Sequence, residues 1–150
     1  MSSSRTFFAI WLAALALHGA AVPADLDKVR AERNLDRRAR LAMENAALQL
    51  RAASAAEASG DLGRMEKAIN EVGESVDLAY ESLQATGRNP RNSRQYKDFE
   101  TRLRALLRNL EGFRQRLGFE QREQIAPLVE HLEKIHDQVV RDILTPSKKK

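Results

Sequence analysis

Apolar residues that recur every three or four positions constrain the fold of this chain more than any other feature. The pattern runs through three consecutive segments that Gly and Pro residues separate. Its members are Leu62, Met65, Ile69, Val72, Val76, Ala79 and Leu83, then Tyr96, Phe99, Leu103, Leu106, Leu110, Phe113 and Leu117, and finally Ile125, Leu128, Leu132, Ile135, Val139 and Ile143. This spacing places the apolar side chains on one stripe of an α-helix, which must be buried against other helices. The sequence therefore predicts an all-α fold.

An alanine-rich segment precedes these three and completes the predicted domain. Its less regular apolar face comprises Leu35, Ala39, Ala42, Ala46, Leu50 and Ala53. We expect helices over about 35–58, 62–86, 94–117 and 120–144. Matched lengths and short connections favour an antiparallel up-down-up-down four-helix bundle over residues 25–145. Two separately packed hairpins are the alternative.

Residues that cap or end helices mark the expected boundaries. Helix starts are expected at the caps Asn34, Asp61 and Ser93, and helix ends at Gly60, Gly87 and Gly118. Residues 26–31 then form a lead-in turn or a short helix. Pro127 leaves two starts for the last helix: near Glu120, with a kink at the proline, or near Ala126, with the proline in the first turn. The longer, kinked helix is favoured.

The first 24 residues have the layout of a secretory signal peptide. Arg5 supplies a positive charge, Phe7–Leu17 is an uninterrupted apolar run, and Ala24 ends a short segment that suits signal peptidase. The apolar run is shorter than the ~20 residues that cross a bilayer, so no transmembrane anchor is expected after cleavage. Cleavage is expected after Ala24, with Ala21 as the next candidate. The prediction is an exported protein, periplasmic or secreted.

Composition and charge exclude several functional classes. The chain contains no cysteine, which rules out thiol catalysis, cysteine-based zinc sites and c-type haem attachment. Its pI of 9.7 arises from the tail, because residues 25–147 carry 21 basic and 21 acidic side chains. Residues 146–150, with Lys148, Lys149 and Lys150, are expected to be a disordered basic tail in weak contact with anionic membrane surfaces. A neutral exported domain is not expected to bind nucleic acid.

Charge alternates along the predicted helices. Residues 25–56 carry 7 basic and 5 acidic side chains, and residues 57–87 carry 2 and 7. Residues 88–118 carry 9 and 3, and residues 119–147 carry 3 and 6. In a bundle whose consecutive helices are neighbours, each helix would face the opposite charge. Since exposed ion pairs contribute only ~0–1 kcal/mol each, the pattern selects a topology more than it stabilises one.

No combination of side chains predicts catalysis or a metal site. Glu133 and His136 form one Glu-x-x-His element, but the second copy that di-iron bundles need is missing. Met43 and His131 lie near the middle of their helices and are the one pair suited to axial haem ligation, although neither occupies a predicted core position. We therefore expect no enzyme activity and no cofactor, with a haem-type bundle as the alternative.

A basic stripe on the third long helix is the strongest surface signal. It consists of Arg94, Lys97, Arg104 and Arg108, and Arg91 precedes it. The stripe is a candidate surface for an anionic partner such as a lipid head group, a lipopolysaccharide phosphate or an acidic protein. The other interpretation, which charge alternation favours, is that these side chains balance the acidic surfaces of neighbouring helices.

Four strings of the chain resemble a family of uncharacterised exported bacterial helical proteins. They are DLDKV from Asp25, NLDRRARLAMENA from Asn34, ESVDLAYESLQATGRNPR from Glu74 and IHDQVVRDIL from Ile135. The resemblance implies a complete helical domain and no particular activity. The functional expectation is thus an exported, non-enzymatic helical bundle that binds a protein partner or an envelope component.

Overall fold

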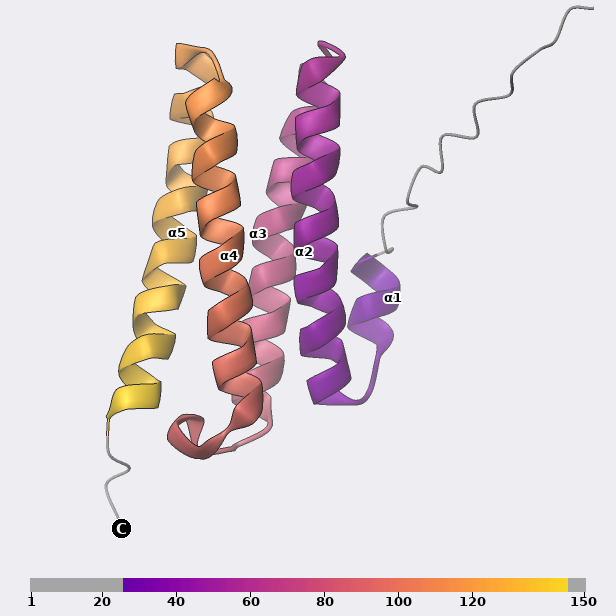
Figure 1. Ribbon diagram of the computed structural model, residues 1–150. Coiled ribbons are helices and arrows are strands. Elements are labelled where there is room, and N and C mark those ends of the chain that lie inside the picture. The colour runs from indigo at the N-terminus through magenta and orange to yellow at the C-terminus, as the bar shows by residue number, and fades with distance from the viewer. Residues whose placement is uncertain (1–25, 146–150) are drawn as a thin grey trace, which may run out of the picture.

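The computed structural model describes residues 26–145, which are helical and contain no strand (Figure 1). The elements are α1 (Leu26–Ala31), α2 (Leu35–Ala58), α3 (Leu62–Ala85), the 3₁₀ turn η1 (Pro90–Asn92), α4 (Arg94–Arg116) and α5 (Phe119–Leu144). The bounds of the four long helices lie within one residue of those expected from the spacing. The predicted signal peptide and basic tail lie outside the described residues.

Side-chain caps fix the starts of the first three long helices. The side chains of Asn34, Asp61 and Ser93 each accept a hydrogen bond from the backbone N–H three residues later, at 2.9, 3.0 and 3.4 Å. Gly60 and Gly87 end the preceding helices with φ of 75° and 65°, the left-handed conformation that glycine adopts without steric cost.

The junction between α4 and α5 differs from the expected glycine stop. Gly118 has φ −65° and serves as the N-cap of α5, so α4 ends without a left-handed residue. Pro127 lies inside α5, which is the longer of the two expected helices. Because proline has no N–H, the carbonyl of Glu123 loses its helical donor at that point.

Of the two alternatives for residues 26–31, the structure has the short helix, α1, which the count of four helices did not include. Leu26 and Val29 of this short helix are buried, and α1 packs against α2. The guanidinium of Arg30 also lies 3.0 Å from the carboxylate of Glu74 on α3. Residues 26–31 therefore belong to the packed domain rather than to a lead-in turn.

The long helices form two antiparallel hairpins, and the way in which the hairpins meet differs from the expected order. α2 packs most extensively on α3, and α4 packs on α5. Between the hairpins, α2 lies beside α4 and α3 beside α5, and both pairs run in the same direction (Figure 1); α3 also contacts the antiparallel α4. In the expected arrangement every neighbour was antiparallel, so the parallel pairs α2–α4 and α3–α5 were not expected. Within the described residues, no helix is both long and apolar enough to cross a membrane.

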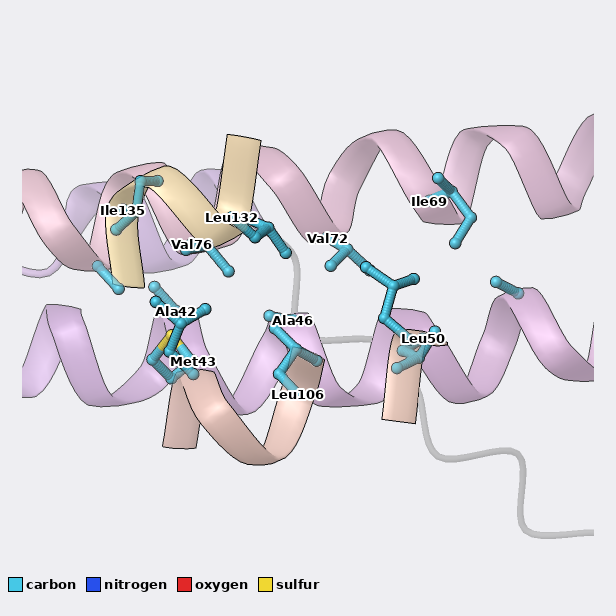
Figure 2. Packing of buried hydrophobic residues seen from close by; sticks show 14 of the residues in the cluster. Ala42, Met43, Ala46, Leu50, Ile69, Val72, Val76, Leu106, Leu132 and Ile135 are labelled. Atoms are coloured by element: carbon cyan, nitrogen blue, oxygen red, sulfur yellow. The ribbon is translucent and has the colours of Figure 1, made fainter. Parts of the chain in front are cut away.

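The core gathers the predicted apolar stripes of all four long helices. Figure 2 shows Ala46 and Leu50 of α2, Val72 of α3 and Leu132 of α5 directed toward one another. The stripe positions that are not fully buried are Leu35, Leu62, Leu128 and Ile143, and Leu62 is 49% exposed because it opens α3 at the end of the bundle.

Residues outside the predicted stripes also join this core: besides Leu26 and Val29 of α1, they are Met43, Ala56, Ala68 and Val129. Val129 of α5 is buried beside the half-buried Leu128. Met43 of α2 is only 4% exposed and lies among the core residues (Figure 2). The sequence prediction that Met43 is not a core residue is wrong, because α2 buries a broader face than its alanine stripe indicates.

Candidate functional site: the groove between α2 and α4

The way in which the two hairpins pack separates net-positive helices from net-negative helices. α2 and α4 come from the two net-positive segments, 25–56 and 88–118, and they lie side by side. α3 and α5 come from the two net-negative segments, 57–87 and 119–147, and they also lie side by side. Opposite charges meet within each hairpin, as expected, whereas between the hairpins the two net-positive helices adjoin and so do the two net-negative ones. The molecule consequently has a basic face along α2 and α4.

The four side chains of the basic stripe are all exposed on α4. Arg104 pairs with Glu100, 3.3 Å away on the same helix. Arg94, Lys97 and Arg108 form no ion pair with any acidic side chain of residues 26–145. No ion pair among residues 26–145 therefore supports the interpretation that the stripe balances the acidic side chains of neighbouring helices.

The groove between α2 and α4 contains a proximal pocket, near the starts of both helices. Its volume is about 590 Å³. Four arginines and two aspartates line it, together with Asn34, Ala39, Met43, Leu83, Gln95 and Phe99. Three of the arginines already have acidic partners: Arg37 with Glu32 at 3.1 Å, Arg40 with Glu44 at 2.8 Å, and Arg102 with Asp98 at 2.8 Å. Ion pairs therefore neutralise most of the positive charge at this end.

A distal pocket of about 330 Å³ lies farther along the same groove, toward the ends of α2 and α4. Its lining comprises Ala47, Leu50, Arg51, Ser54, Leu106, Arg108, Asn109, Gly112, Phe113 and Arg116, with no acidic side chain. Arg51 and Arg108 have no ion-pair partner among residues 26–145. The distal pocket is thus the place where positive charge in the groove is left without compensation.

Arg116 lines the distal pocket and is held there by contacts to both helices. Its guanidinium donates to the hydroxyl of Ser54 on α2 at 3.3 Å and to the carbonyl of Gly112 at 3.2 Å. It also lies 5.7 Å from the ring centroid of Phe113, a cation–π distance. These contacts leave the positive charge itself without an anionic partner.

Met43 and His131, the pair suited to the alternative of a haem-type bundle, lie in different environments. Met43 is buried in the core, whereas His131 is exposed and its Nε2 lies 2.7 Å from Oδ1 of Asp77. His136 likewise contacts Glu100 at 3.0 Å, and this pair joins α5 to α4. Within residues 26–145, no three His, Asp or Glu side chains are grouped so that they could hold a metal ion. The two histidines therefore act as links between helices.

A buried polar cluster between α2 and α3 was not predicted. The side-chain amide of Asn45 donates to Glu71 and to Ser75, both at 2.9 Å, and Gln49 donates to Glu71 at 3.0 Å. Asn45 Oδ1 has no partner although it is fully buried. The cluster fixes how the two helices pair, because a shift would leave the carboxylate of Glu71 without its donors.

Two tyrosines outside the lining of these pockets, Tyr80 of α3 and Tyr96 of α4, have shifted pKa values. Burial raises the pKa of Tyr96 above its ordinary value. Burial, followed by the nearby carboxylate of Asp142, raises the pKa of Tyr80. The ring of Tyr80 stacks on that of Phe99 at 6.0 Å and 13°. Both phenols therefore stay neutral at physiological pH and contribute packing across α3 and α4.

Sequence reasoning found Arg108 but missed Arg51 and Arg116. Arg116 lies on the flank of α4 that faces α2, away from the stripe, and Arg51 belongs to a helix that was not expected to adjoin α4. The only signal available was that the two net-positive segments are the first and third long helices.

Comparisons with family models, with curated proteins and with solved structures give no match to this chain.

Proposed function

We propose that the protein is an exported, non-enzymatic helical bundle that binds an anionic partner along the basic face formed by α2 and α4. The proposal takes the four long helices as one up-down-up-down unit with α1 packed on its side. It takes residues 1–24 as a cleaved leader, so that the mature chain begins at Asp25 or at Val22. N-terminal sequencing of the exported protein checks this start.

One observation supports the binding proposal: the two net-positive helices are neighbours, and five of their eight exposed cationic side chains form no ion pair with residues 26–145. In the stripe, Arg94, Lys97 and Arg108 have no acidic partner among residues 26–145, although the segment 119–147 of the adjoining α5 is net acidic. Like charges held on one face repel one another and destabilise the folded state slightly. A partner of opposite charge relieves that repulsion and is drawn to the face over about a Debye length.

The test replaces the stripe with neutral residues of similar size. The variant carries Arg94→Gln, Lys97→Gln, Arg104→Gln and Arg108→Gln, and the probes are phosphatidylglycerol vesicles and poly-glutamate. We expect the wild type to bind at least one probe at low salt and to weaken steeply toward physiological salt. The variant should lose this binding and keep its melting temperature or gain slightly, because the repulsion is removed.

A control variant removes the same charge from residues that acidic side chains already neutralise. Its substitutions to Gln are at Arg37, Arg40, Arg88 and Arg102. We expect the control to keep most of the binding. Unchanged binding in the stripe variant, together with a lower melting temperature, would show that the stripe only balances charge within the bundle.

A further inference from the structure

We propose that the distal pocket is a binding site for a phosphate monoester, held by Arg51, Arg108 and Arg116. This inference rests on the proposed anionic partner and names its chemistry and location. The pocket differs from the rest of the groove in one respect: no acidic side chain lines it. At the proximal end, in contrast, three arginines are engaged by Glu32, Glu44 and Asp98.

The number of guanidinium groups favours phosphate over a single carboxylate. A phosphate monoester carries close to two negative charges at neutral pH and presents three terminal oxygens. Each guanidinium can donate two parallel hydrogen bonds to such an anion. Three arginines around one carboxylate would leave an excess of positive charge in the pocket, whereas a dianion uses it more fully.

The two helices present these side chains from opposite walls. Arg51 comes from α2, and Arg108 and Arg116 come from α4. Arg116 is already oriented by Ser54 and Gly112, so less of its conformational freedom is lost when it binds an anion. Ser54 and Asn109 add neutral polar groups to the lining.

The floor of the pocket indicates an organic ester rather than an inorganic ion. Leu50, Leu106 and Phe113 form this floor, and each is less than a tenth exposed. Their carbon surface offers contacts to the organic part of an ester. The volume of about 330 Å³ is at the small end of the range for ligand pockets and fits a head group of a few atoms.

The experiment compares two double variants that remove one arginine from each wall of the groove. The test variant is Arg51→Gln with Arg116→Gln, and the matched control is Arg40→Gln with Arg102→Gln in the neutralised proximal pocket. The probes are glycerol 3-phosphate in solution and vesicles that contain phosphatidic acid, both phosphate monoesters, at constant ionic strength. Thermal melts of all variants establish that the fold is intact.

We expect saturable binding of glycerol 3-phosphate by the wild type, with amide shifts confined to residues around 47–54 and 106–116. The test variant should lose about tenfold or more in affinity, since it loses charge-assisted hydrogen bonds, and the control less than about twofold. Stronger binding to the vesicles assigns the ester to a membrane head group, and stronger binding in solution assigns it to a soluble metabolite.

Equal losses of affinity for glycerol 3-phosphate in the two double variants would overturn the assignment of the site to the distal pocket, because overall charge alone would then explain the binding. Tighter binding of a glutamate-rich peptide, lost in the same test variant, would overturn the assignment to phosphate. A different result would overturn the proposed function alone. In that case glycerol 3-phosphate would still bind the wild type, but the four-residue stripe variant would keep its binding to phosphatidylglycerol vesicles and poly-glutamate.

Discussion

At the scale of single residues, Leu106 and Arg104 sit two positions apart on α4 in opposite environments. Leu106 is 4% exposed and contributes to the core, while Arg104 is exposed and pairs only with Glu100 one turn earlier. Leu106→Ala should lower the free energy of unfolding by ~2–5 kcal/mol, since it removes buried carbon and leaves a cavity. Arg104→Ala should change it by less than about 0.5 kcal/mol.

Denaturant unfolding of the two variants measures this contrast. Similar losses at both positions would mean that α4 is rotated from the orientation described above. The spacing of apolar residues predicted most of the core for the same reason: each long helix has only one apolar face, and that face is the one that becomes buried. The burial of Met43 was not predicted, because this residue lies at the edge of the alanine face of α2. At that position the packing of α2 against its neighbours decides whether a side chain is buried.

At the scale of elements, Gly73 sets how closely α3 approaches α5. A Cβ at this buried position would lie 3.0 Å from Cδ1 of Leu128, whereas a Cβ at Gly112 in α4 would meet nothing within 4 Å. Gly112→Ala should stabilise by ~0.5–1 kcal/mol, because alanine loses less backbone entropy in a helix. Gly73→Ala should gain less or lose stability, since the new methyl group overpacks the contact with Leu128.

The coupling between Gly73 and Leu128 can be measured directly. Adding Leu128→Ala to Gly73→Ala frees the space that the new methyl group needs, so the combined cost should be smaller than the sum of the two single costs. Additive costs would indicate that α3 and α5 do not meet at this point. Helix bounds were predictable because caps and left-handed glycines act locally, but the closeness of two helices is a property of their packing.

At the scale of the whole molecule, the order in which the helices meet is the decisive feature. Ser54 of α2 and Asn109 of α4 line the same pocket, and the chain has no native cysteine. Ser54→Cys with Asn109→Cys should therefore be joined within one molecule by a short bismaleimide. Ser54→Cys with Glu123→Cys, a pair that links α2 to α5, should react poorly, because α5 is not a principal neighbour of α2.

Mass spectrometry of the digested protein identifies the cross-link. Efficient reaction of the second pair and failure of the first would restore the ring of consecutive helices that the charge alternation predicted. In that ring the basic helices would be separated by acidic helices, and the proposed anion-binding surface would lose its basis. The cross-link therefore tests the arrangement on which both functional proposals depend.

The sequence alone determined the elements. Heptad spacing, the caps Asn34, Asp61 and Ser93, and the glycines at 60 and 87 act over a few residues, so local chemistry is enough to place the long helices. It also identified the basic stripe as the strongest surface charge, since residues three and four apart share one helix face.

Only the tertiary structure decided which helices are neighbours, and with them the distal pocket. Burial of the apolar stripes contributes far more to stability than exposed ion pairs, each of which contributes ~0–1 kcal/mol. The packing of the apolar faces, and not the charge alternation, therefore determines which helices are neighbours. Arg51 and Arg116 lie on different helices, 65 positions apart in the chain, and no local pattern links them. Their meeting depends on how the alanine-rich face of α2 fits against α4, which is a matter of shape rather than of sequence spacing.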